Sequence, residues 1–416
     1  MDRIIMPSDL KGEIQAPPSK SMTQRAIAAS LLSGGESIIL NPSACDDSLA
    51  AISIASALGA TVVSEPGQLR ITGSGGIKEN QLNCGESGLA IRMFSPVAAL
   101  YDSEIVITGT GSLTKRPMSM VEDALKQLGV GCKSSDGLLP LWIKGPLKGG
   151  SCRIDGSLSS QLLTGLLMAL PVAVNDSEVI VENLKSRPYI DMTLQVLERF
   201  GIRINKTDYS RFSIPGSQIY QPQKFEVEGD WSGGAFLLVA GAINGEITVK
   251  GLRPDSRQSD KAILDVLDRA GARTTIMENS VSVKKSELKP FYFDATESPD
   301  LFPPLVALAA YCRGISTIKG VSRLIHKESN RSATLVNEFL KMNVKIETQD
   351  DDMIITGGKI TGAEVCSHGD HRIAMAAAVA ALASSSRVII RDSGCVAKSY
   401  PEFFKDLRDL GAMVYE

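Results

Sequence analysis

Apolar residues recur at helical spacing in six segments of the chain, and each segment stops at a glycine or an asparagine before a β-rich run begins. Between residues 51 and 58, apolar side chains stand at positions i, i+3, i+4 and i+7, which places them on one face of a helix. A glycine or asparagine at the stop is typical of a helix that ends in the left-handed conformation. The stops lie 68 to 72 residues apart, at Gly59, Gly129, Gly201, Gly271, Asn343 and Gly411.

Each repeat also holds a second helical segment that is apolar on nearly all sides and precedes a β-branched run. Residues 24–40 and 372–390 are two examples. A helix without a polar face is expected to lie buried between layers. The combined pattern predicts an α/β (α+β) fold built from six βαβαββ repeats of about 70 residues.

The sixth repeat stops early, and the first residues of the chain supply what it lacks. Residues 3–21 have the same layout of apolar and polar positions as residues 353–372. We therefore expect the N-terminal segment to complete the last repeat by closing a ring. Because six repeats around one core would make an unusually large domain, we predict two lobes of three repeats each. The predicted lobes are residues 19–228, and residues 1–18 together with 229–416.

Composition narrows the class of protein. With 43% hydrophobic and 22% charged residues, the chain has the balance of a soluble globular protein. Its longest apolar run, residues 373–383, is about half a membrane span, and its first residues lack the apolar core of a signal sequence. Seven scattered cysteines indicate reduced thiols, so we expect a cytoplasmic protein without a membrane partner. The net charge of -3 argues against a nucleic-acid partner.

Polar, glycine- and serine-rich sequences precede both helices of every repeat. Helix N-termini offer free N–H groups and the positive end of the helix dipole, so they favour anions. In pseudo-symmetric repeats these positions can converge on one cleft between the lobes, and so many cations there suit a substrate with several phosphates or carboxylates. For any single cation, a solvated surface charge is the alternative. The cations concerned are Lys20, Arg25, Arg92, Arg116, Lys327, Arg331, Arg372 and Lys398.

The sequence lacks the motifs of P-loop nucleotide sites, of serine hydrolases and of zinc metalloproteases. The sequence has no P-loop, no G-x-S-x-G and no H-E-x-x-H. Cys366, His368 and His371 form a short C-x-H-x-x-H cluster that could hold a metal ion. We interpret His371 and Arg372 instead as an anion-binding helix start with Asp370 as its cap.

Four serines in these loops are candidates for either capping or ligand binding. Ser21, Ser159, Ser160 and Ser186 each suit a helix cap when taken alone. The run Ser159, Ser160 and Gln161 favours a polyol phosphate, because three hydrogen-bonding side chains stand in a row.

Two acids have the same double interpretation. Asp300 directly precedes an apolar helix, where it is either a cap or a general base for a substrate hydroxyl. Glu328 lies between Lys327 and Arg331, and nearby cations would keep it ionised until proton transfer.

Seven motifs spread from about residue 12 to residue 407 resemble the 5-enolpyruvylshikimate-3-phosphate synthase family, a group of enolpyruvyl transferases. They are PPSKSMTQRA, DGSLSSQLLTGLL, RPYIDMTL, SPD, HKESNR, DHRIAMA and AKSYPEFF. The resemblance implies a two-lobed inside-out α/β barrel with three βαβαββ repeats per domain. It implies transfer of the enolpyruvyl group of phosphoenolpyruvate to the 5-hydroxyl of shikimate 3-phosphate through a tetrahedral intermediate, by a monomer without a metal or organic cofactor.

The resemblance also implies roles for individual residues. Asp300 would deprotonate the 5-hydroxyl, and Glu328 or, as its rival, Lys20 would protonate the methylene carbon. The implied shikimate 3-phosphate ligands are Lys20, Ser21, Arg25, Ser159, Ser160, Gln161, Ser186, Tyr189, Asp300 and Lys327. The implied phosphoenolpyruvate ligands are Lys20, Gly88, Arg116, Gln161, Glu328, Arg331, Arg372 and Lys398.

Three departures from the family pattern concern loops of the expected site. Residues 86–92, ESGLAIR, lack the usual Asn-Ala-Gly-Thr run. Arg323 stands where the family usually has a substrate-binding asparagine, and Asn330 replaces an aspartate beside Arg331.

Two rival functions remain open at this stage. UDP-N-acetylglucosamine enolpyruvyl transferase shares the fold and the donor, but it has Lys-Asn where this chain has Lys20 and Ser21, and a reactive cysteine where this chain has GSLTKRPM. The other rival is a non-catalytic anion-binding protein on the same scaffold.

Overall fold

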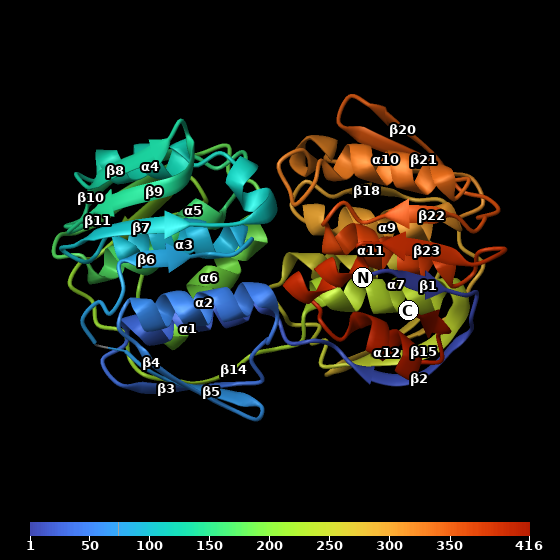
Figure 1. Cartoon of the computed structure of the whole chain (residues 1–416), viewed down its shortest axis with the longest axis horizontal. Coiled ribbons are helices and arrows are strands. Elements are labelled where there is room, and N and C mark those ends of the chain that lie inside the picture. The colour runs from blue at the N-terminus through green and yellow to red at the C-terminus, as the bar shows by residue number, and fades with distance from the viewer. Residues whose placement is uncertain (74) are drawn as a thin grey trace. The chain divides into compact units, whose positions relative to one another are not determined.

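The computed structural model describes residues 1–73 and 75–416. In this part of the chain the fold divides into two compact units, residues 18–227 and residues 1–17 together with 228–416. Each unit has its own hydrophobic core, and each contains six of the described α-helices and three of the described four-stranded sheets (Figure 1).

The three sheets of residues 18–227 share one strand order. In each sheet the first two strands are parallel and the later neighbours are antiparallel. The sheets are β14 (Lys224–Glu226), β3 (Glu36–Leu40), β5 (Gln68–Thr72) and β4 (Thr61–Glu65); β6 (Gln81–Asn83), β7 (Glu104–Thr108), β9 (Leu138–Lys144) and β8 (Gly131–Ser135); and β10 (Gly150–Asp155), β11 (Ser177–Glu182), β13 (Arg211–Ile214) and β12 (Asn205–Thr207).

The sheets of the other unit repeat the same order and the same strand directions. The six-fold recurrence confirms the predicted βαβαββ repeat. The sheets are β2 (Leu10–Gln15), β15 (Gly245–Lys250), β17 (Ser280–Lys284) and β16 (Arg273–Met277); β18 (Tyr292–Asp294), β19 (Ile315–Lys319), β21 (Asp352–Thr356) and β20 (Lys345–Gln349); and β22 (Glu364–Cys366), β23 (Val388–Arg391), β1 (Arg3–Ile5) and β24 (Val414–Tyr415).

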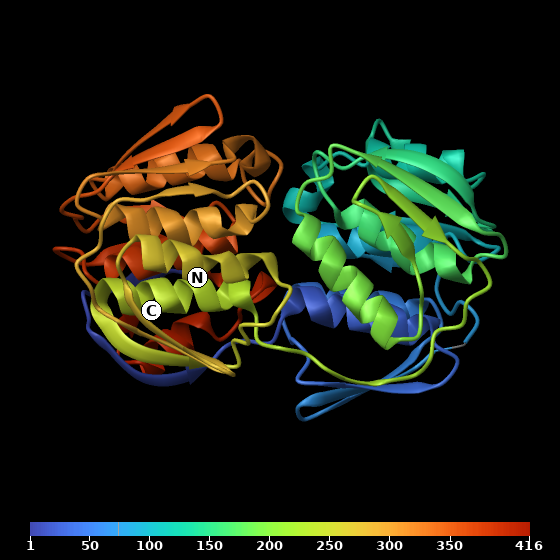
Figure 2. The same cartoon turned by 180° about the vertical axis from the view of Figure 1, so that it is seen from behind.

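The N-terminal segment is built into two sheets of the second unit. Strand β1 lies between β23 and β24, with Ile4 opposite both Ile389 and Tyr415. Strand β2 runs parallel to β15, with Leu10 opposite Gly245. In Figures 1 and 2 these dark blue strands accordingly lie beside yellow and red elements. Residues 1–17 therefore complete a unit that otherwise begins at residue 228.

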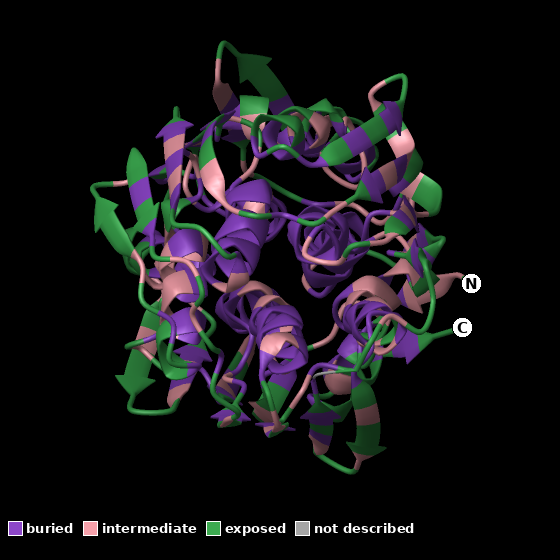
Figure 3. Ribbon diagram, turned by 90° about the vertical axis from the view of Figure 1, so that its left-hand side faces the viewer, coloured by how far each residue is buried: buried purple, intermediate pink, exposed green. Residues whose placement is uncertain are grey.

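One helix of each repeat is buried along almost its whole length, as its all-apolar sequence predicts. Figure 3 shows buried helices in the interior and strands around them that alternate between buried and exposed residues. An inside-out α/β barrel has this arrangement, with helices inside and sheets outside. The buried helices are α1 (Lys20–Leu32), α3 (Gly88–Ala98), α5 (Gln161–Ala169), α7 (Trp231–Asn244), α9 (Phe302–Ala310) and α11 (His371–Ala381).

The other helix of each repeat buries one face and ends at the predicted residue. The six predicted stop residues all have positive φ, from 64° at Asn343 to 115° at Gly59, so the predicted left-handed helix ends are confirmed. These helices are α2 (Asp46–Ala57), α4 (Ser119–Gln127), α6 (Arg187–Arg199), α8 (Ile263–Arg269), α10 (Arg331–Lys341) and α12 (Phe403–Asp409).

Short 3-10 helices lead into or follow several of these elements. They are η1 (Gly111–Lys115), η2 (Leu170–Val172), η3 (Ser259–Ala262), η4 (Pro299–Leu301), η5 (Val321–Leu324) and η6 (Ser393–Lys398). Of the helices described here, none has the length and apolarity needed to cross a membrane.

Candidate active site

Helix α1 presents a lysine at its N-terminus. Ser19 is the cap, and its hydroxyl accepts a hydrogen bond from Met22 N at 3.5 Å. Lys20 Nζ lies 2.9 Å from a carboxylate oxygen of Asp47 in the first turn of α2. Ser21 therefore lies within the first turn of α1, and the capping role that its position suggested belongs to Ser19.

Arg25 joins helix α1 to helix α6. Its side chain is 1% exposed, and it donates to Ser21 O at 2.8 Å, Thr193 Oγ1 at 2.9 Å and Tyr189 O at 3.3 Å. Burial lowers the pKa of Arg25 to about 10, so it stays charged at neutral pH. The arginine thus places Ser21 and Tyr189, two predicted shikimate 3-phosphate ligands, around one buried cation.

The start of helix α5 carries the Ser-Ser-Gln run. Ser159 Oγ accepts a hydrogen bond from Gln161 N at 3.1 Å, whereas the Ser160 side chain makes no capping hydrogen bond. Ser186 holds the equivalent cap position of α6 with a left-handed φ of 57°, and it too makes no side-chain cap. Ser160 and Ser186 therefore occupy cap positions without performing the capping role that local sequence suggests.

The side chains of Arg92 and Arg116 lie beside the N-terminus of helix α3. A Cβ atom added to Gly88 would lie 2.7 Å from Arg116 Nη1 and 3.0 Å from Arg92 Nη1. Arg92 Nη1 also donates to Gln161 Oε1 at 3.1 Å. The absence of a side chain at Gly88 thus lets two guanidinium groups lie beside a helix N-terminus, an arrangement that binds anions.

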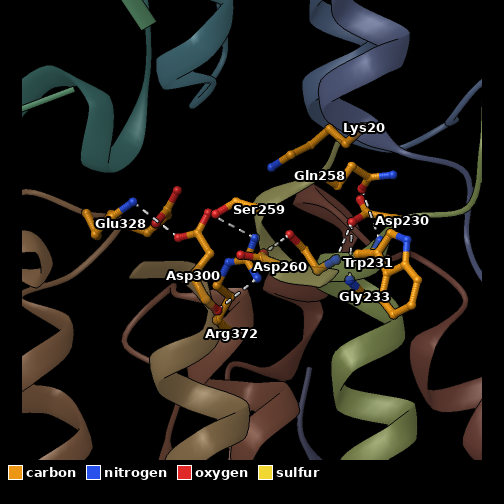
Figure 4. Close-up of polar contacts among 12 residues, drawn as sticks. Lys20, Asp230, Trp231, Gly233, Gln258, Ser259, Asp260, Asp300, Glu328 and Arg372 are labelled. Atoms are coloured by element: carbon orange, nitrogen blue, oxygen red, sulfur yellow. Dashed lines mark hydrogen bonds and ion pairs between the residues drawn. The ribbon is translucent and has the colours of Figure 1, made fainter. Parts of the chain in front are cut away.

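In the other unit, Asp300 is surrounded by three cations. Its carboxylate lies 2.9 Å from Arg331 Nη1, 3.2 Å from Lys327 Nζ and 3.3 Å from Arg372 Nη2. Figure 4 shows Arg372 beside Asp300. Burial alone would raise the pKa of Asp300, but these cations outweigh it and hold the pKa well below its usual range. Asp300 is therefore an ionised carboxylate in an ion cluster, and it is not a helix cap, because the cap of η4 is Ser298 and that of the apolar helix α9 is Leu301.

Arg331 links Asp300 to two further acids. Its side chain is 0% exposed, and it lies 2.5 Å from Glu328 Oε2 and 2.9 Å from Asp370 Oδ2. Burial alone would lower the pKa of Arg331, but Asp370, Glu328 and Asp300 raise it above its usual value. The buried guanidinium therefore fixes three carboxylates relative to one another.

Helix α11 begins with the predicted cap. Asp370 caps the helix by accepting a hydrogen bond from Arg372 N at 3.0 Å, as predicted. Lys398 Nζ, at the end of η6, donates to Gly369 O at 2.7 Å, so this lysine contacts the loop before α11. At α10, Asn330 provides the cap through a hydrogen bond from Ala333 N at 3.3 Å.

The histidines of the C-x-H-x-x-H cluster do not gather around a common point. His368 Nε2 lies 2.8 Å from Glu338 Oε1, and His371 is buried at the start of α11. Among residues 1–73 and 75–416, no group of three or more histidines, cysteines or acids is placed to hold a metal ion.

Two further carboxylates lie among these groups although the sequence analysis did not single them out. Asp260, 1% exposed, accepts a hydrogen bond from Ser232 Oγ, and Figure 4 shows it near Asp300 and Arg372. Burial, followed by the negative charge of Asp300, raises the pKa of Asp260 to about 7. Glu86 contacts the loop that carries Arg116. The available signal was their place before repeated helices, in RPDSRQSD and NCGESGLAIR.

Comparison with known proteins gives one consistent family. The family model for EPSP synthase (3-phosphoshikimate 1-carboxyvinyltransferase) matches residues 4–407. The 3-phosphoshikimate 1-carboxyvinyltransferase of Methanocorpusculum labreanum is 38% identical over 100% of both chains, and that of Methanosarcina mazei is 40% identical over 99% of this chain and 98% of its own. A solved EPSP synthase from Acinetobacter baumannii matches with a TM-score of 0.84 and 26% identity over 100% of both chains. The chain therefore belongs to the EPSP synthase (3-phosphoshikimate 1-carboxyvinyltransferase) family.

Proposed function

We propose that the chain carries out the reaction of its family through the charged residues described above. This reaction transfers the enolpyruvyl group of phosphoenolpyruvate to the 5-hydroxyl of shikimate 3-phosphate in the shikimate pathway. The hydroxyl oxygen bonds to the central carbon of phosphoenolpyruvate while a proton adds to the methylene carbon. Loss of phosphate and of a proton from the methyl group then restores the double bond.

The residues of the unit 18–227 would hold much of shikimate 3-phosphate. Its anionic groups suit Lys20 and the buried Arg25, and its hydroxyls suit the serines and Gln161 at helix starts. The hydroxyl of Ser160 makes no capping bond although it stands at a cap position, which supports this assignment. The proposed ligands of this unit are Lys20, Ser21, Arg25, Ser159, Ser160, Gln161, Ser186 and Tyr189.

Phosphoenolpyruvate, with a phosphate and a carboxylate, would be held by guanidinium and ammonium groups. Arginine forms paired hydrogen bonds to both groups, and buried arginine keeps its charge. The proposed ligands are Lys20, Gly88, Arg116, Gln161, Glu328, Arg331, Arg372 and Lys398.

Asp300 would act as the general base for the 5-hydroxyl, with Lys327 assisting. Without ligands its pKa is held well below the usual range by Arg372, Lys327 and Arg331, which makes it a weak base. Anions bound to those same cations would neutralise part of their charge and raise the basicity of Asp300. Substrate binding would therefore make Asp300 a stronger base. The ion cluster around Asp300 is the main observation that supports the proposed mechanism.

Protonation of the methylene carbon needs a second group. Glu328, which lies 2.5 Å from the buried Arg331, is our first candidate, and it must take up a proton before it can donate one to the methylene carbon; Lys20 is its rival. We also propose that the chain acts as a cytoplasmic monomer.

The test is phosphate release in the presence of one or both substrates. We expect release only when phosphoenolpyruvate and shikimate 3-phosphate are both present. Release with UDP-N-acetylglucosamine as the acceptor would overturn the assigned acceptor, and no release with either acceptor would indicate a binding protein.

The role of Asp300 is tested by comparing turnover with binding. In Asp300→Ala we expect kcat to fall by about 100-fold or more, the range for loss of a general base, while the Kd for shikimate 3-phosphate changes much less. Asp300→Asn keeps the shape of the side chain and serves as its isosteric control. Equal losses in kcat and in binding would make Asp300 a ligand only.

A further inference from the structure

Glu86 lies just before helix α3 and binds a second loop of its repeat. Its Oε2 atom accepts hydrogen bonds from Ser112 N at 2.8 Å and from Ser112 Oγ at 3.0 Å. Ser112 belongs to the 3-10 helix η1, which ends immediately before Arg116. One carboxylate oxygen therefore accepts both available donors of Ser112.

The Glu86 carboxylate packs directly against the backbone of Gly111, where a side chain would clash with it. Gly111 has a φ of 54°, and a Cβ atom added there would lie 2.3 Å from Glu86 Cδ. Next to it, Thr110 N donates to Gly85 O at 2.7 Å. The turns 85–86 and 110–112 are thus joined by a backbone bond as well as by the Glu86 carboxylate.

Ser112 connects Glu86 to Arg116. Its hydroxyl donates to Glu86 and accepts from Arg116 Nη2 at 3.4 Å. A carboxylate acceptor polarises the hydroxyl and makes its oxygen a better acceptor for the guanidinium. The other nitrogen, Arg116 Nη1, is the atom closest to the vacant side-chain position of Gly88. Ser112 therefore restrains one end of the guanidinium while the other end faces the start of α3.

We propose that Glu86 is a positioning residue that, through Ser112, orients Arg116 for binding the anionic substrate phosphoenolpyruvate. The inference rests on the proposed role of Arg116 as a ligand of that substrate. This role would explain why the loop ESGLAIR begins with the carboxylate Glu86, where the family usually has the run Asn-Ala-Gly-Thr. Because Glu86 keeps the Arg116 side chain oriented, Arg116 loses less conformational entropy when the substrate binds. Glu86 takes no part in the proton transfers.

The experiment measures the KM for each substrate and kcat in single and double variants. Net loss of one ordinary hydrogen bond corresponds to about a 3- to 10-fold change, and the effect of Glu86 reaches Arg116 only through Ser112, so we expect Glu86→Ala to raise the KM for phosphoenolpyruvate by that factor. The KM for shikimate 3-phosphate should change by less than about twofold. Glu86→Gln keeps an oxygen that can accept both Ser112 donors, so it should lose less than Glu86→Ala.

The relay through Ser112 is tested by a double-mutant cycle. If the effect of Glu86 passes through the Ser112 hydroxyl, Ser112→Ala combined with Glu86→Ala should raise the KM for phosphoenolpyruvate by less than the product of the two single effects. Effects that simply multiply would overturn the relay.

A matched control comes from the same unit. Glu122 also accepts hydrogen bonds from the backbone N and the hydroxyl of one serine, Ser134, but it lies on α4 and binds no proposed ligand residue. Glu122→Ala should therefore lower thermal stability about as much as Glu86→Ala without changing the KM for phosphoenolpyruvate. Equal rises in KM in these two variants would make Glu86 a merely structural residue.

Failure of this inference can be told from failure of the proposed function. Arg116→Ala should raise the KM for phosphoenolpyruvate more than any Glu86 variant. If Arg116→Ala has no effect, the proposed role of Arg116 is wrong. If Arg116→Ala has its effect and Glu86→Ala stays within twofold of the unchanged protein, the positioning role of Glu86 is wrong.

Discussion

At the scale of single residues, buried charges control the chemistry of the unit 1–17 with 228–416. Arg331 is fully buried and stays compatible with the core because it lies against Asp300, Glu328 and Asp370. Removing one partner of such a group leaves an uncompensated buried charge, which costs several kcal/mol. Asp260 differs, because burial and then the negative charge of Asp300 raise its pKa, so its proton is retained to a higher pH than usual.

This difference predicts how Asp260→Asn changes stability with pH. Burial and the charge of Asp300 raise the pKa of Asp260 in the folded chain to about 7, whereas an unfolded aspartate has a pKa of about 4. The protonated form therefore stabilises the fold below about pH 4, and this contribution is lost as the pH rises towards 7. Asparagine keeps the acceptor for Ser232 but cannot ionise. We expect Asp260→Asn to gain stability relative to the unchanged protein by at most about 1.4 kcal/mol per pH unit between pH 5 and pH 7.

Urea unfolding of both proteins at pH 5, 6, 7 and 8 measures this gain. Asp268→Asn is the control, because Asp268 is exposed on the neighbouring helix α8. The groups that act on Asp260 are Ser232, Asp230, Asp300 and Arg372. A stability difference that does not depend on pH would contradict an ionisable buried Asp260.

At the scale of elements, each amphipathic helix is followed by a residue whose backbone has a positive φ. Gly129, after α4, has a φ of 75°, and a Cβ atom added there would meet nothing within 4 Å. Any cost of a side chain at this position is therefore a cost of the left-handed conformation alone. We expect Gly129→Ala to destabilise the chain by about 1 kcal/mol and Gly129→Asn by less, because asparagine tolerates this conformation.

Chemical denaturation of the two variants checks this expectation. Gly34→Ala provides the comparison, since Gly34 also has an open Cβ position but no positive φ. An equal loss of stability at positions 34 and 129 would mean that the helix end does not depend on the left-handed conformation.

These helix ends also show which part of the fold can be predicted from sequence. Periodicity and a stop residue are local signals, and they gave the six repeats and the cap at Asp370. The pairing of Glu86 with Ser112 joins residues 26 positions apart, and the contact of Arg331 with Asp370 joins residues 39 apart. Such contacts depend on how segments far apart in the sequence pack, so the motifs indicated roles for Asp300 and Arg331 without predicting that the two side chains touch. For the same reason Asp260 was recognisable only as one polar residue among many before a helix.

At the scale of the whole molecule, one unit is formed by a continuous stretch of the chain and the other by two separate stretches. Residues 18–227 are continuous, and their core is built from their own helices and sheets. The other unit takes β1 and β2 from the opposite end of the sequence, and β1 is an inner strand with partners on both sides. A fragment 228–416 would expose the edges of β23, β24 and β15 and would lose the buried side chains of Ile5 and Leu10.

We therefore expect fragment 18–227 to fold alone and fragment 228–416 to fold only with residues 1–17 present. Circular dichroism and cooperative urea unfolding measure both outcomes, and adding a peptide of residues 1–17 to fragment 228–416 should restore a cooperative transition. Fragment 18–227 also holds most of the proposed shikimate 3-phosphate ligands but lacks Asp300 and Lys327. It should bind shikimate 3-phosphate more weakly than the full chain, and it should release no phosphate, because the proposed base is absent. Cooperative unfolding of fragment 228–416 without the peptide would show that β1 and β2 are dispensable for its core.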